Sequence, residues 1–148
     1  VLFGSEKGGS IKFIQTPAIS SEYWRLLGQN FLTYQELGEQ DKYHTPFFRA
    51  IHSGGRAFSD EESLSAFYEQ LGGDKQTYIN AFNSVGVASE ISRADNMARR
   101  LKVAMVPSIV IQGKYLVRTS GSVGPKRMLD VMDYLVEKEL AERSNNDS

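Results

Sequence analysis

The spacing of apolar residues changes three times along the chain, and these changes constrain the fold more than any other feature. Residues 11–15 alternate apolar and polar side chains, which predicts a short strand that stops before Pro17. From residue 20 the apolar residues recur at helical spacing. Strand patterns return at 108–111 and 115–117, and a last helical pattern begins at Gly124-Pro125. The predicted order is strand, several helices, β-hairpin and helix.

Capping residues and glycines set the limits of the predicted helices. The first is expected to begin at a Ser20 cap and to stop at Gly38. A shorter one is expected to begin at Thr45-Pro46, because a capping residue followed by proline is typical of a first turn. The others are predicted from a Ser59–Glu62 capping box to Gly72, around 78–82, and over about 88–101.

Composition narrows the functional classes. A chain of 148 residues with 41% hydrophobic residues fits one compact domain. The net charge of -1 gives no global attraction to nucleic acid or to an anionic membrane, and no apolar run is long enough to cross a bilayer. We expect a soluble chain from which any signal peptide has been removed. With no cysteine, the chain cannot form disulfides, thiolate metal sites or a thiol nucleophile.

No motif in the sequence predicts a metal or a cofactor. His44 and His52 lie eight residues apart without matching carboxylate or cysteine ligands. The run Asp60-Glu61-Glu62 is better explained as the solvated start of a helix. The segment Gly4 to Ser10 lacks the Gly-Lys-Ser/Thr ending of a phosphate loop. The many aromatic residues at helical spacing are expected to be core.

The candidate site is Met105-Val106-Pro107-Ser108, which leads into the apolar strand 108–111, a Gln112–Lys114 turn and a second strand. This order reads as the second half of a thioredoxin fold, where the proline before the strand is normally cis. The cis form of an X-Pro bond costs only about 0.5–1 kcal/mol, so a fold can hold it. The alternative is an ordinary trans bond at the start of an edge strand. A cis loop would present the backbone of Val106 to an extended peptide.

Several segments in the same order resemble the DsbA family of bacterial periplasmic thiol-disulfide oxidoreductases. They span roughly residues 11–140 and are 11–18, the aromatic helix from Ser20, His44 to His52, Phe58-Ser59-Asp60, and Met105 to Tyr115. The resemblance implies an α/β, thioredoxin-like fold with a large helical insertion. The thioredoxin-like part would be 11–19 and 102–143, and the inserted helical domain 20–101. Residues 1–10 would be an N-terminal remnant and Gly/Ser-rich linker, and 144–148 a polar tail.

The resemblance also implies a function in the periplasm. Members of the family introduce disulfides into exported proteins, and a membrane redox partner restores their own disulfide. The expected partners are therefore unfolded or extended polypeptides and that membrane protein. Met105, Val106, Pro107 and Ser108 would bind substrate, and no residue of this chain would be catalytic.

The chain departs from the family at its beginning. The family's Cys-x-x-Cys motif follows the first strand at the N-terminus of a helix, where the helix dipole favours the thiolate. Here Val1-Leu2-Phe3 is followed by Gly4 to Ser10 and then by the next predicted strand, so the motif and its helix are absent. Seven residues are too few for a βαβ crossover. We hypothesise that the catalytic strand and helix are missing or replaced by a linker, in an engineered or truncated form or through loss of residues from this sequence.

Three functional interpretations stay open. The chain represents a DsbA-like oxidoreductase without its catalytic motif, a redox-inactive peptide-binding or chaperone-like module, or a helical scaffold whose hairpin only completes the core. Loss of a central strand and helix would expose apolar surface. Such surface favours association, so a dimer or a swapped assembly is a further expectation.

Overall fold

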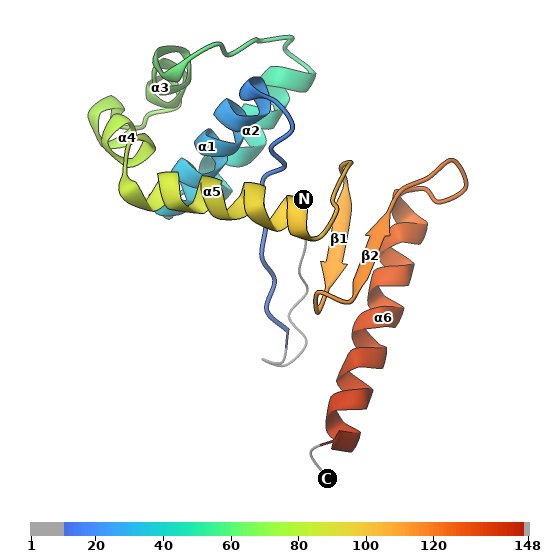
Figure 1. Ribbon diagram of the computed structural model, residues 1–148. Coiled ribbons are helices and arrows are strands. Elements are labelled where there is room, and N and C mark those ends of the chain that lie inside the picture. The colour runs from blue at the N-terminus through green and yellow to red at the C-terminus, as the bar shows by residue number, and fades with distance from the viewer. Residues whose placement is uncertain (1–10, 147–148) are drawn as a thin grey trace. The chain divides into compact units, whose positions relative to one another are not determined.

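The computed structural model describes residues 11–146 (Figure 1). The described chain divides into two compact units, one of residues 17–96 and the other of residues 11–16 and 97–146. The described residues form six helices and two strands, and no helix among them is long and apolar enough to cross a membrane. The predicted strand remnant Val1-Leu2-Phe3 and the linker Gly4 to Ser10 lie outside the described residues.

The helical unit is built from five consecutive helices, the last of which continues for four residues into the other unit. Side-chain oxygens cap the N-termini of four of them and satisfy backbone N–H groups that have no partner within the helix. The backbone N–H groups of Trp24, Ser63, Thr77 and Val87 donate to the side chains of Ser21, Asp60, Asp74 and Ser84 at 3.2, 2.8, 2.7 and 3.0 Å, respectively. The helices are α1 (Glu22–Glu36), α2 (Gln40–His52), α3 (Glu61–Gln70), α4 (Lys75–Phe82) and α5 (Val85–Arg100).

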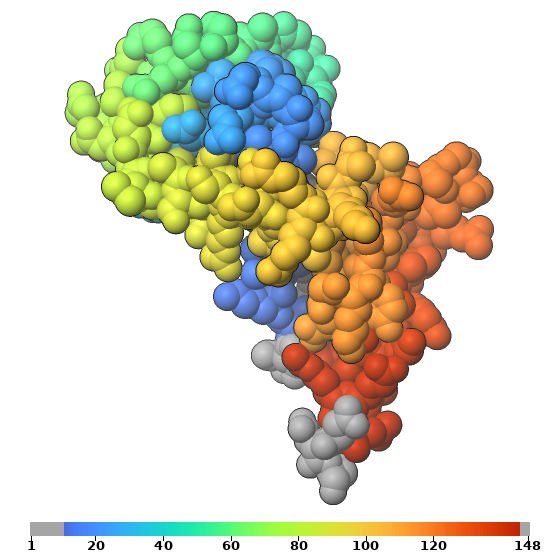
Figure 2. Space-filling view, in the orientation of Figure 1, coloured from blue at the N-terminus to red at the C-terminus, as the bar shows by residue number. Residues whose placement is uncertain are grey.

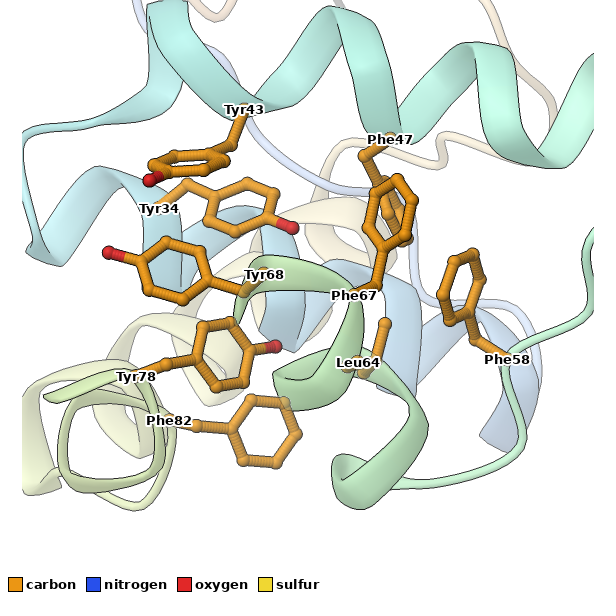
Figure 3. Close-up of a cluster of buried hydrophobic side chains, with 9 residues drawn as sticks. All are labelled: Tyr34, Tyr43, Phe47, Phe58, Leu64, Phe67, Tyr68, Tyr78 and Phe82. Carbon is orange, nitrogen blue, oxygen red and sulfur yellow. The ribbon is translucent and has the colours of Figure 1, made fainter. Parts of the chain in front are cut away.

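Aromatic side chains fill the core of the helical unit (Figure 3). Tyr34, Tyr43 and Tyr78 are completely buried, and the Tyr43 ring centroid lies 4.4 Å from that of Tyr68. The Tyr78 hydroxyl donates a 2.7 Å hydrogen bond to the side-chain oxygen of the equally buried Asn30. Rings at this spacing gain packing energy beyond the burial of their area. The prediction that the aromatic residues form core is therefore correct for this cluster, which consists of Tyr34, Tyr43, Phe47, Phe58, Leu64, Phe67, Tyr68, Tyr78 and Phe82.

The second unit contains an antiparallel hairpin packed on a long helix. The strands β1 (Ser108–Ile111) and β2 (Tyr115–Arg118) are joined by a turn in which Gln112 and Gly113 have φ values of 52° and 67°. Positive φ at both central turn residues matches the twist of a two-stranded ribbon. One face of the hairpin packs on α6 (Pro125–Asn146), as the contact between orange and red residues shows (Figure 2). The buried residues there are Ile109, Ile111, Val117 and Met128.

The predicted strand at residues 11–15 is wrong, because residues 11–19 have no regular secondary structure. Alternation of apolar and polar residues is typical of a strand, but it does not by itself establish a regular ladder of backbone hydrogen bonds. The sheet in the described part of the chain contains only β1 and β2, paired with each other. Ile19, at the end of this segment, packs instead against a cluster formed by α1 and α5.

The predicted start of the second helix at Thr45-Pro46 is also wrong. The helix α2 begins at Gln40, so Pro46 lies inside it. Proline within a helix removes one backbone hydrogen bond. The buried rings of Tyr43 and Phe47, four residues apart on one face, anchor this helix in the aromatic core across that position.

Smaller differences concern element ends. The first helix is capped by Ser21 rather than Ser20, and the capping box of α3 joins Asp60 and Ser63 rather than Ser59 and Glu62. The helix α4 begins at residue 75, α5 begins at residue 85 instead of 88, and α6 extends to residue 146. The predicted polar tail is therefore helical over 144–146, where the Ser144 hydroxyl donates to the Leu140 carbonyl.

Candidate functional site

The candidate loop begins where α5 ends. The backbone N–H of Val103 donates to the Ala98 carbonyl at 2.9 Å, and Lys102 has a φ of 54°. A residue in this left-handed region is a common way to end a helix and to satisfy its last carbonyls. The chain then runs through residues 103–107 into β1, so the loop is held by a helix end on one side and a strand on the other.

The loop presents apolar side chains to solvent. Met105 is 47% exposed and Val106 is 39% exposed, and the Val106–Pro107 peptide bond is cis. Among residues 11–146 the structure shows no hydrogen bond to the backbone N–H or C=O of Val106. The loop therefore offers one donor, one acceptor and an apolar surface at adjacent positions.

Ser108 fixes the base of the loop. It is 1% exposed, and its hydroxyl donates a 2.5 Å hydrogen bond to the carbonyl of Met105. As the first residue of β1 it is in register with Arg118 of β2. A buried hydroxyl that is paired in this way restricts the backbone of the loop, because breaking the bond would leave a buried polar group unsatisfied.

The sequence prediction named the four loop residues but not Arg118. Its exposed side chain brings a positive charge to the end of the hairpin that carries the loop. The register follows from the turn at Gln112-Gly113, because counting back from the paired Ile111 and Tyr115 brings Ser108 opposite Arg118. The turn signal in the sequence was therefore sufficient to find this residue.

The far end of the hairpin carries an ion pair. The Lys114 Nζ donates a 2.7 Å hydrogen bond to Oε2 of Glu139, whose side chain is 7% exposed. This bond holds the pKa of the Glu139 carboxyl below its usual value and raises the pKa of the Lys114 ammonium. The pair ties the turn to α6 and thereby supports the hairpin from the end opposite to the loop.

The two histidines lie in the helical unit. The His44 ring meets Phe31 edge-on at 5.6 Å, and burial lowers the pKa of its imidazole. The His52 ring lies 4.1 Å from that of Phe48. In the part of the chain that the structure describes, no three side chains of His, Cys, Asp or Glu are grouped as a metal site would require. Each histidine ring lies beside an aromatic ring.

Comparison with known proteins decides the family. Residues 10–135 match the family described as the DSBA-like thioredoxin domain. The chain belongs to this family. The fold of this DSBA-like chain is accordingly a thioredoxin fold with a helical insertion, of which the described sheet is a small antiparallel pair.

Relatives of this DSBA-like chain are bacterial proteins named thiol:disulfide interchange protein DsbA. The Azotobacter vinelandii protein is 34% identical over 129 residues, which cover 87% of this chain and 60% of the relative. The Pseudomonas aeruginosa protein is 31% identical over 131 residues, which cover 88% and 62%. The chain thus spans about three fifths of the length of these curated relatives.

Solved structures agree with this assignment. Pseudomonas aeruginosa DsbA superposes with a TM-score of 0.88 at 29% identity, covering 94% of this chain and 72% of that one. Xylella fastidiosa DsbA gives a TM-score of 0.81 at 26% identity, with 91% and 72% covered. The 148 residues of this DSBA-like chain contain no cysteine, so they cannot exchange a disulfide by themselves.

Proposed function

We propose that this chain is the scaffold and substrate-binding part of a DsbA-like thiol:disulfide oxidoreductase. The loop of Met105, Val106, Pro107 and Ser108 would hold an extended polypeptide while disulfide exchange occurs at cysteines that these 148 residues do not contain. Those cysteines would come from another segment of the same polypeptide. On its own, the chain is expected to be catalytically incompetent.

The observation that carries the proposal is that the backbone of Val106 makes no hydrogen bond within residues 11–146, in a loop where Met105 and Val106 are both exposed. An extended peptide recognised by strand addition needs backbone groups of this kind for affinity and nearby apolar surface for selectivity. A structure of Proteus mirabilis DsbA has the peptide PWATCDS bound non-covalently. That protein is 18% identical to this chain and shares its fold, with a TM-score of 0.68.

The binding claim is tested by calorimetric titration with PWATSDS, a cysteine-free form of that peptide. Val106→Asp places a solvated charge in the loop, and Val131→Asp places the same charge on α6 at a similarly exposed valine, 36% against 39%. We expect the first variant to weaken binding by about tenfold and the second to leave it unchanged. Equal effects of the two variants, or no binding by the parent chain, would count against the proposal.

The redox claim is tested by an insulin-reduction assay. Since no thiol is present, the chain should give the rate of a protein-free control. Clear turnover by the pure chain would contradict the proposal.

The absence of cysteine also favours a second function, a redox-inactive module that binds extended peptides in a chaperone-like way. Both functions predict the same peptide binding, so the open reading frame distinguishes them. A Cys-x-x-Cys motif encoded in the same polypeptide supports the oxidoreductase, and its absence from the whole polypeptide supports the module.

We propose the periplasm as the compartment and a membrane redox partner for the whole protein, on the strength of the DsbA relatives.

Assembly into a dimer or a swapped form is proposed on other grounds. Both strands of the described sheet are edge strands, and an unprotected edge can pair with a second copy. Light scattering of the pure chain tests this, because a dimer has twice the 16.6 kDa mass of the monomer.

A further inference from the structure

Met105 stands apart from the other three methionines in its exposure. It is 47% exposed, whereas Met128 is 3% exposed and both Met97 and Met132 are partly buried. The chain has four methionines and no cysteine, so thioethers are its only sulfur atoms. A soluble oxidant that reacts with sulfur therefore meets Met105 first.

The position of this thioether follows from the backbone around it. The Met105 carbonyl accepts the 2.5 Å hydrogen bond from the buried Ser108 hydroxyl, which keeps the residue in place at the base of the loop. Its side chain is thus exposed next to Val106, whose backbone is proposed to pair with the peptide. A chemical change at this sulfur alters the apolar surface that a bound peptide would touch.

We propose that Met105 is a peroxide-sensitive modification site whose oxidation to the sulfoxide weakens peptide binding. The inference rests on the proposed function of the loop. In the reaction the thioether sulfur attacks one oxygen of hydrogen peroxide, a sulfur–oxygen bond forms and the oxygen–oxygen bond breaks. The sulfur loses two electrons, and the peroxide is reduced to one molecule of water.

The sulfoxide weakens binding because it is polar. A thioether adapts to apolar partners and loses little when it leaves water, whereas the sulfoxide oxygen must be dehydrated on contact with an apolar peptide side chain. We expect the dissociation constant for PWATSDS to rise by about tenfold, the equivalent of one lost apolar contact. Sulfoxide formation is chemically reversible by methionine sulfoxide reductases, so binding should return after reduction.

The modification itself is tested by peptide mapping. The folded chain is treated with hydrogen peroxide for increasing times, and the oxidised fraction of each methionine is measured by mass spectrometry. Met105 should be oxidised first and Met128 last, in the order of their exposure. Oxidation of Met128 at the same rate as Met105 would overturn the assignment, whatever the peptide does.

The consequence for binding is tested with two variants of the same chemistry. Met105→Leu keeps an apolar side chain that peroxide does not oxidise, so its affinity for PWATSDS should survive the treatment. Met132→Leu, on α6, keeps Met105 and should lose affinity as the parent does. In addition, Met105→Gln should bind weakly without any peroxide, because it imitates the polarity of the sulfoxide.

The outcomes separate this inference from the function on which it rests. Absence of PWATSDS binding by the untreated parent would reject the proposed function, and the mapping would still decide whether Met105 is the oxidised residue. Normal binding that persists after complete Met105 oxidation would reject the effect on binding and leave the peptide-binding function standing.

Discussion

The hydroxyl of Ser108 donates a hydrogen bond to the carbonyl of Met105, 2.5 Å away, and so connects the first residue of β1 to the loop before it. Ser108 is 1% exposed, so Ser108→Ala removes a buried hydroxyl and leaves the Met105 carbonyl without this donor. We expect Ser108→Ala to lower the free energy of unfolding by about 1 kcal/mol and to weaken PWATSDS binding. Urea denaturation and calorimetry measure the two effects.

The matched control is Ser120→Ala. Its exposed hydroxyl lies 3.4 Å from that of Ser122, so replacing it should change neither quantity. If Ser108→Ala lowered stability but left peptide affinity intact, the hydrogen bond would be structural only.

A buried hydrogen bond in the aromatic core gives a second prediction. The Tyr78 hydroxyl donates to the Asn30 side chain at 2.7 Å, and both residues are completely buried. In Tyr78→Phe the Asn30 oxygen loses this partner, so we expect a loss of about 1–3 kcal/mol in the free energy of unfolding. Thermal and urea unfolding measure it. Tyr134→Phe, at a tyrosine that is 66% exposed, should be neutral; comparable losses in both variants would refute the argument.

The Lys114–Glu139 pair predicts a pH dependence. The hydrogen bond from Lys114 lowers the pKa of Glu139 from its usual 4.5, so the folded state favours the carboxylate. The stabilisation is fully present above pH 4.5 and is lost as the pH falls through the lower pKa of the folded state. Glu139→Gln should therefore have a lower free energy of unfolding than the parent at pH 7. The difference in free energy of unfolding between the two should become smaller as the pH falls.

Unfolding in urea at several pH values below 5 measures this difference in free energy of unfolding. Glu90→Gln removes a carboxylate from an exposed pair with Arg93. The difference in free energy of unfolding between this variant and the parent should change little with pH. If the difference in free energy of unfolding between Glu139→Gln and the parent stayed constant down to pH 2, the charge of the pair would not contribute to stability.

Gly73 gives a prediction about space in the core. A Cβ added there would lie 2.1 Å from a ring carbon of Tyr68, which is 2% exposed and packed among other rings. Gly73→Ala should lower the free energy of unfolding by about 1–3 kcal/mol, because the ring has to move. At Gly121 no atom lies within 4 Å of an added Cβ, so Gly121→Ala should be tolerated. Equal melting temperatures of the two variants would contradict this packing.

Much of the fold was predictable because its signals are local. Apolar stripes, glycine stops and capping residues identified the helices, and the Gln112-Gly113 turn identified the hairpin. Residues 11–15 were misassigned as a strand, because alternation of apolar and polar residues does not by itself establish a regular ladder. Pro46 was taken for a helix start, because the tertiary anchors of α2, Tyr43 and Phe47, are not visible as local signals.

The residues of the candidate site were predictable, but the hydrogen bond that fixes the loop was not. The order of Met105, Val106, Pro107 and Ser108 before an apolar strand is readable in the sequence. The bond from the Ser108 hydroxyl to the Met105 carbonyl is not, because a serine at a strand start has several possible acceptors. The opposition of Arg118 to the loop required only the strand register and was overlooked.

The most direct test of the central claim is an NMR titration of the isotope-labelled chain with PWATSDS. If the loop binds extended peptides, the backbone amides of Val106 and Ser108 shift with increasing peptide, while that of Lys114 at the far end of the hairpin does not. Unchanged amides at Val106 and Ser108 under saturating peptide, or shifts confined to other parts of the chain, would contradict the claim.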